Sequence, residues 1–255
     1  MRFIDYYGDK RLRHKIVYEK DAYSECIYCG AKADTREHIP SKVFLVKPYP
    51  DNLAIVPACF GCNNSFSYDE LFLSILIEKL KYKYYGSQFA YTEETLARLN
   101  NNKKLEGEIE KAISRNNINE LEERIKRVLF KLAIGHAVYE TSEGYCLKNV
   151  TVKYAFLNNM SDEEIENFCQ PLIIDGQLFP EVGSRAYERI RVLEVKLSST
   201  NDPNKHLTTQ VLCLEWVEVQ ASKYIYTSYR FGDEIVVKLI INDFLYALVI
   251  IYVDE

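Results

Sequence analysis

Two Cys-x-x-Cys pairs near the start of the chain constrain its fold more than any other feature. One pair is Cys26 and Cys29, and the other is Cys59 and Cys62. Four thiolates in two such pairs can surround one Zn²⁺ as a tetrahedron, so the spacing predicts a zinc ion that joins two segments with little core of their own. The alternative is a set of free cysteines that only pack. The other cysteines, Cys146, Cys169 and Cys213, are scattered along the chain.

Composition and charge favour a cytoplasmic protein with a local, rather than a global, basic surface. Paired Cys-x-x-Cys motifs indicate metal in a reducing compartment, and the first residues do not resemble a secretory signal. The longest apolar run, residues 235–253, contains Lys238 and Asp243 and predicts no membrane span. The net charge is −5, yet residues 1–50 hold ten Lys and Arg against seven Asp and Glu. This local excess permits nucleic-acid binding without requiring it.

The pattern along the chain predicts an α+β fold in three parts. Residues 1–75 form a small metal module, in which 43–46 and 53–56 are short strands and a helix starts at Asp69. Residues 76–140 are helical, with Thr92 as an N-cap and a long helix over 119–139. Residues 141–255 are rich in antiparallel β-structure, after a short helix capped by Ser161 and Glu164. The expected strands are 191–197, 210–219, 224–229 and 234–253.

Catalytic chemistry, if present, must come from the residues around the cysteines, because a four-cysteine zinc site has no open position. Glu37 and His38 are adjacent, and Asn63 follows the last cysteine. A carboxylate and an amide oxygen suit Mg²⁺, which would neutralise charge on a scissile phosphate. His38 has a side chain whose pKa suits a general base at neutral pH. The alternative is that Glu37 and His38 are ordinary loop residues.

The order of these motifs resembles the HNH endonuclease family, in its four-cysteine, zinc-stapled branch with the ββα-metal fold. The resemblance covers about residues 23–72: Cys-x-x-Cys, then Glu37-His38-Ile-Pro, Asn52-Leu, and Pro-Ala-Cys59-x-x-Cys62-Asn63. It implies that Glu37 and Asn63 hold a catalytic Mg²⁺ or Mn²⁺ and that His38 is the general base. It also implies that Asn52 braces the loop that presents the histidine.

The sequence departs from the family pattern at several positions. The third motif residue is Asn63 rather than histidine, and Asn52 lies two residues farther from Cys59 than in the usual compact form. The Lys-rich segment that often follows the last cysteine is replaced by residues 64–70, which end in Asp69 and Glu70. Either acid can add a carboxylate to the metal site, or both can cap and solvate the following helix. A basic cluster on residues 124–131 can track phosphates or form a solvated helix face.

These features lead to two hypotheses of different kinds. The first is a metal-dependent endonuclease that hydrolyses phosphodiester bonds in DNA, with structural zinc and catalytic Mg²⁺ or Mn²⁺, in bacterial defence or a mobile element. The second is a catalytically inactive zinc knuckle that binds nucleic acid or protein. The presence of Glu37, His38 and Asn63 together favours the enzyme. In either case the β-rich region after residue 140 is expected to contact a protein partner or a second copy of the chain, and no membrane partner is expected.

Overall fold

A β-hairpin in the first quarter of the chain leads directly into a long helix. The structure, a computed structural model, describes residues 2–4, 15–17, 25–51, 53–115, 118–141, 149–174, 189–198 and 206–252. Strand β3 (Thr35–Ile39) pairs antiparallel with β4 (Ala54–Ala58), and α1 (Phe60–Tyr85) begins two residues later. The short 3-10 helix η1 (Lys42–Phe44) lies between the two strands. Two further short strands, β1 (Arg2–Ile4) and β2 (Lys15–Val17), pair with each other.

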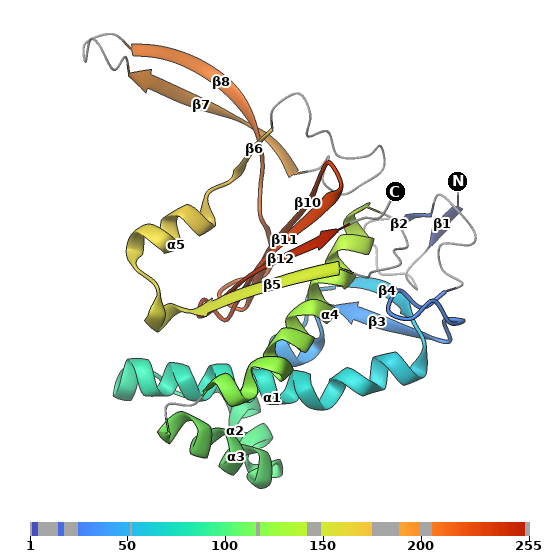
Figure 1. Cartoon of the computed structure of the whole chain (residues 1–255), viewed down its shortest axis with the longest axis vertical. Coiled ribbons are helices and arrows are strands. Elements are labelled where there is room, and N and C mark those ends of the chain that lie inside the picture. The colour runs from blue at the N-terminus through green and yellow to red at the C-terminus, as the bar shows by residue number, and fades with distance from the viewer. Residues whose placement is uncertain are drawn as a thin grey trace.

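The helical part packs around α1. The second long helix, α4 (Glu122–Thr141), lies against α1, and the short helices α2 (Glu93–Asn101) and α3 (Lys103–Ser114) pack on α1 from another side (Figure 1). Thr92 caps α2 as predicted, since its hydroxyl accepts a bond from the Thr95 N–H. The 3-10 turns η2 (Gly86–Gln88) and η3 (Ile118–Leu121) connect these helices.

A five-stranded antiparallel sheet covers the other side of α4. Its order is β5-β12-β11-β10-β9, formed by Asn149–Phe156, Leu245–Tyr252, Glu234–Ile241, Tyr224–Phe231 and Val217–Gln220. Helix α5 (Asp162–Cys169) follows the 3-10 turn η4 (Leu157–Asn159), and Ser161 and Glu164 form the predicted capping box. The α+β class with antiparallel sheets is thereby confirmed.

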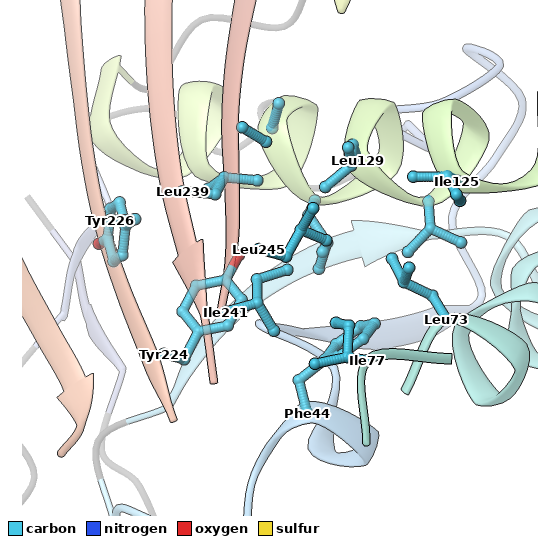
Figure 2. Close-up of a cluster of buried hydrophobic side chains, with 14 of the residues drawn as sticks. Phe44, Leu73, Ile77, Ile125, Leu129, Tyr224, Tyr226, Leu239, Ile241 and Leu245 are labelled. Atoms are coloured by element: carbon cyan, nitrogen blue, oxygen red, sulfur yellow. The ribbon is translucent and has the colours of Figure 1, made fainter. Parts of the chain in front are cut away.

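A single hydrophobic core joins the hairpin, the helices and this sheet. Figure 2 shows Leu73 and Ile77 of α1, Ile125 and Leu129 of α4, and Leu239, Ile241 and Leu245 of the sheet within one cluster. Helix α4 approaches β3 closely at Gly135, where an added Cβ would lie 2.3 Å from Cδ1 of Ile39. Helix α4 therefore runs between the hairpin and the sheet, and the predicted parts 1–75, 76–140 and 141–255 share one core.

A separate three-stranded ribbon extends away from this body. Its order is β6-β8-β7, from Leu172–Ile174, His206–Leu214 and Ile190–Ser198. In Figure 1 the ends of β7 and β8 project beyond the five-stranded sheet as an arm. Strands β7 and β8 pair along their whole length, from Ile190↔Leu214 to Ser198↔His206.

Several predicted boundaries were wrong. Residues 43–46 are not a strand, since η1 occupies Lys42–Phe44, and α1 begins at Phe60 rather than Asp69. The predicted strand 210–219 is two strands, β8 and β9, and 234–253 is also two, β11 and β12. Asn242 and Asp243 take positive φ angles of 56° and 50° between β11 and β12, a turn conformation that Asn and Asp tolerate. Among the described helices, none has the length and apolarity to cross a membrane.

Candidate metal centre and the polar cluster behind it

The four paired cysteines converge on one point. The Sγ atoms of these residues all lie within 4.8 Å of one another: Cys26, Cys29, Cys59 and Cys62. The Sγ atoms of Cys29 and Cys59 are 3.7 Å apart. A tetrahedral zinc with Zn–S bonds of about 2.3 Å places its sulfurs about 3.8 Å apart. The cluster therefore has the size and the ligand chemistry of a four-thiolate zinc site.

Two different local structures present the two pairs. The first pair lies on a tight turn, in which the Gly30 N–H donates to the Cys26 carbonyl at 2.8 Å and Gly30 takes a φ of 72°. The second pair lies at the start of α1, where Cys59 is the N-cap. The Cys62 N–H donates to Cys59 Sγ at 3.4 Å. This bond first, and then hydrogen bonds with the other three thiols, lower the pKa of the Cys59 thiol to about 7. A helix N-terminus favours a thiolate, which is the form that binds zinc.

The α1 N-terminus is fixed to the hairpin by hydrogen bonds. The Asp34 carboxylate accepts the Phe60 N–H at 2.6 Å, and Thr35 Oγ1 donates to the Ala58 carbonyl at 2.8 Å. Asn63 Nδ2 donates to the same Thr35 hydroxyl at 3.2 Å. The Asn63 amide is thus held against β3 through its nitrogen, and its carbonyl oxygen has no hydrogen-bond partner among the described residues.

Glu37 lies on the same face of β3 as Thr35, because alternate residues of a strand point to the same side. It is only 7% exposed. Lys131 Nζ contacts its Oε1 at 2.8 Å, and the Ser41 hydroxyl donates to that same oxygen at 3.4 Å. Burial raises the pKa of the Glu37 carboxyl, and the neighbouring Lys131 charge opposes this effect. Every side-chain contact that Glu37 makes in the described part of the chain is to Oε1, which leaves Oε2 for another ligand.

Behind Glu37 is a buried polar cluster of four residues: Glu37, Ser41, Glu70 and Lys131. Lys131 extends from α4 and is fully buried, and it forms ion pairs with both Glu37 and Glu70. Ser41 lies within hydrogen-bond distance of the Glu70 carboxylate and 2.8 Å from Lys131 Nζ. In this cluster the Lys131 ammonium of α4 binds one carboxylate from β3 and one from α1, and so connects the three elements. We refer to it below as the Lys131 cluster.

His38 lies on the opposite face of β3 from Glu37. It is half-buried, and burial together with the nearby Lys42 charge lowers the pKa of its imidazole. The ring is therefore neutral at physiological pH, as a general base must be. No hydrogen bond among the described residues joins His38 to Glu37 or to Asn63. Asn52, the fourth predicted site residue, lies outside the described residues.

Sequence reasoning missed Lys131 and Ser41. The run of basic residues on α4 is more typical of a solvated helix face, but Lys131 is completely buried, and Arg124 and Arg127 both bind Asp69 of α1. Asp69 and Glu70 were expected to cap a helix beginning near them. They lie instead in the middle of α1 and are buried against α4. The burial of two adjacent acids on one helix could not be recognised without knowing that α4 supplies three cations.

No protein-family model matches the chain, and neither a curated protein nor a solved structure matches it. The chemical capacity of the site therefore rests on its own residues. The four sulfurs can hold a structural metal ion. Beside them the hairpin and α1 offer a carboxylate oxygen, an amide oxygen and a neutral imidazole within one small unit.

Proposed function

We propose that this protein is a metal-dependent endonuclease of the HNH type, acting on DNA. The observation that supports the proposal best is the four-sulfur cluster at the junction of a β-hairpin and a helix that together carry Glu37, His38 and Asn63. Zinc in that cluster would be structural, because four thiolates leave no coordination position for a substrate. In the HNH-type mechanism proposed here, a second, oxygen-bound cation would assist the phosphodiester chemistry.

The donor set fits such a cation. Glu37 is held through Oε1 and Asn63 through its amide nitrogen, so each has an oxygen left over. Glu37 Oε2 and Asn63 Oδ1 would hold Mg²⁺ or Mn²⁺, which prefer oxygen ligands. When bound, the cation would neutralise charge on the scissile phosphate and its leaving oxygen. The Lys131 cluster would position the Glu37 carboxylate by holding its other oxygen.

His38 would act as the general base. Its neutral ring can accept a proton from the attacking water at a nitrogen, and its lowered pKa favours this neutral form. The acidic side of the pH–rate profile should consequently extend below the ordinary histidine range. Arg36 shares the outer face of β3 with His38 and is exposed, so it would contact the phosphate backbone.

The test uses zinc-loaded full-length protein and plasmid, linear, single-stranded and branched DNA, with and without Mg²⁺ or Mn²⁺. His38→Ala should lower the cleavage rate by about 10²–10⁴-fold while leaving zinc content and folding unchanged, since the ring is not a zinc ligand. Raised metal concentration should not rescue it. Wild-type cleavage by His38→Ala would remove the histidine from the mechanism.

Glu37→Gln and Glu70→Gln form a matched pair. Both substitutions neutralise one carboxylate of the Lys131 cluster and should perturb folding to a similar extent. Only Glu37→Gln, like Asn63→Ala, should lose cleavage, and part of it should return at raised Mn²⁺. Equal loss in the two glutamate variants would mean that the cluster acts through folding and that Glu37 does not bind the cation.

The alternative function is a catalytically inactive zinc knuckle that binds nucleic acid or protein. The observation in its favour is that Glu37 is almost inaccessible and already paired with an internal cation. A well-folded, zinc-loaded protein that binds DNA and cleaves no substrate with any divalent cation would decide for this alternative. In either case we propose the arm of β7 and β8 as the part of the C-terminal region that contacts a protein partner or a second copy of the chain.

A further inference from the structure

Strand β7 has one edge that pairs with none of the described strands. It is the outermost strand of the β6-β8-β7 ribbon, and it bonds only to β8 among the described strands. In an antiparallel strand of this kind, the N–H and C=O groups of alternate residues point away from the partner strand. Such an edge is a template for another strand, and proteins that remain monomeric usually protect it with a bulge, a proline, charged side chains or a short strand. β7 is nine residues long, without proline and without a register shift against β8.

One face of the ribbon is apolar and exposed. The pairs Leu193↔Val211 and Ile173↔Cys213 place these four residues on a single face. Leu207 lies on the same face of β8 as Val211 because the two are four residues apart. Leu207 is 63% exposed, Ile173 55% and Leu193 39%. The opposite face also exposes an apolar pair, Val192↔Leu212, at 59% and 38% exposure. The ribbon therefore presents apolar surface that a partner would cover.

The outer edge of β7 carries charges that are complementary to those of a second, antiparallel copy of β7. On the opposite face of β7, Glu194 and Lys196 flank Val195 by one residue on either side and form no ion pair with any described residue. If β7 pairs antiparallel with an identical strand and Val195 lies on the twofold axis, Glu194 of each copy faces Lys196 of the other. Oppositely charged residues directly across an antiparallel pair stabilise it, and like charges destabilise it.

We propose that the arm is a homodimer interface, in which β7 adds edge to edge onto β7 of a second copy with Val195 at the twofold axis. A twofold axis perpendicular to the sheet keeps each residue on its own face, so one residue must lie on the axis. The two nearest alternative registers place Glu194 or Lys196 on that axis. The first places two glutamates opposite each other and the second places two lysines opposite each other. Among these registers, only the one with Val195 on the axis places Glu194 of one copy opposite Lys196 of the other. It also extends the apolar face containing Leu193 across both copies. This interface is independent of the nuclease proposal.

The first experiment measures mass by sedimentation equilibrium on the full-length, zinc-loaded chain over a micromolar dilution series. The wild type should approach twice the 29.8 kDa of one chain. Glu194→Lys and Lys196→Glu should each weaken dimerisation by about tenfold or more, since the axis turns one substitution into two like-charge contacts. The double variant Glu194→Lys/Lys196→Glu restores both opposite-charge pairs and should dimerise again. A monomeric wild type, or a dimer that the single variants leave unchanged, would overturn the proposal.

A cross-link tests the register itself. Cα atoms directly across an antiparallel pair are about 4.5 or 5.5 Å apart, within the range that a disulfide spans. Val195→Cys should therefore form a covalent dimer on mild oxidation, visible on a non-reducing gel. Val192→Cys is the matched control, because Val192 lies on the same strand and is 59% exposed but does not face its own copy. Equal cross-linking of the two variants, or cross-linking of the wild type through its native cysteines at the same rate, would refute the Val195 register.

Discussion

Lys131→Met should destabilise the protein more than any other single substitution of a lysine on α4. The side chain is fully buried, and its ammonium is the only cation that contacts Glu37 and Glu70 in the described part of the chain. Methionine has a similar length and leaves no large cavity, so lost packing contributes little. The main effect is electrostatic, since the substitution leaves two buried carboxylates with only the Ser41 hydroxyl between them.

The structure sets the size of this effect. Removing one partner of a buried ion pair costs about 3–5 kcal/mol, because the remaining charge stays buried without compensation. Two carboxylates remain here, at 7% and 6% exposure, so we expect the upper part of that range at neutral pH. A domain of ordinary stability has roughly 5–15 kcal/mol of unfolding free energy. The variant should still fold, with a urea midpoint far below that of the wild type.

Urea unfolding followed by tyrosine and tryptophan fluorescence, on zinc-loaded protein, measures the difference. Lys126→Met on the same helix is the matched control, because Lys126 pairs with Glu122 at the surface and its loss should leave the transition unchanged. Lys131→Met/Glu37→Gln/Glu70→Gln removes all three charges and should recover most of the lost stability, as neutral replacements of buried ion groups often do. The reasoning fails if Lys131→Met costs less than about 1 kcal/mol, or if the triple variant is less stable than Lys131→Met alone.

Three further predictions follow from other sites. Protein purified without added metal should contain one zinc per chain. Cys59→Ser should unfold the hairpin and the start of α1, since structural zinc supplies on the order of 10 kcal/mol of folding free energy. Zinc-free protein of native stability would contradict this. Gly135→Ala should cost about 1–3 kcal/mol in urea unfolding because its Cβ would lie 2.3 Å from Ile39 Cδ1, and Ile39→Val should recover part of the loss. Complete burial, and then the charge of Arg189, hold the pKa of His136 well below 6.5. As pH falls, His136 is therefore protonated in the unfolded chain before it is protonated in the folded protein. The free energy of unfolding should then fall below about pH 6.5, by about 1.4 kcal/mol per pH unit. His136→Gln should remove that slope, and an unchanged slope would assign it to other groups.

The features that the sequence predicted well depend on local patterns. The Thr92 cap, the Ser161–Glu164 capping box and the two cysteines within each pair involve residues at most a few positions apart, so short-range geometry decides them. The two pairs meet because the β3–β4 hairpin brings Cys29 and Cys59, 30 residues apart, together. The antiparallel β-structure after residue 189 follows from alternation in the same way. The predicted strand over residues 43–46 failed because four apolar residues fit a buried 3-10 turn equally well. Periodicity cannot separate the two over so short a run.

Taken alone, the sequence determines a chain with a four-thiolate metal cluster, a helical middle and an antiparallel β end, and it brings Glu37, His38 and Asn63 into one small segment. It does not determine the environment of Glu37. Lys131 is 94 residues away, and its ammonium reaches Glu37 only because α4 packs between the hairpin and the sheet, with Gly135 allowing β3 to approach. Long-range packing of this kind depends on the shape of the whole core, which no local pattern encodes. The tertiary structure thus decided which charges are buried together, and that pairing fixes one oxygen of Glu37.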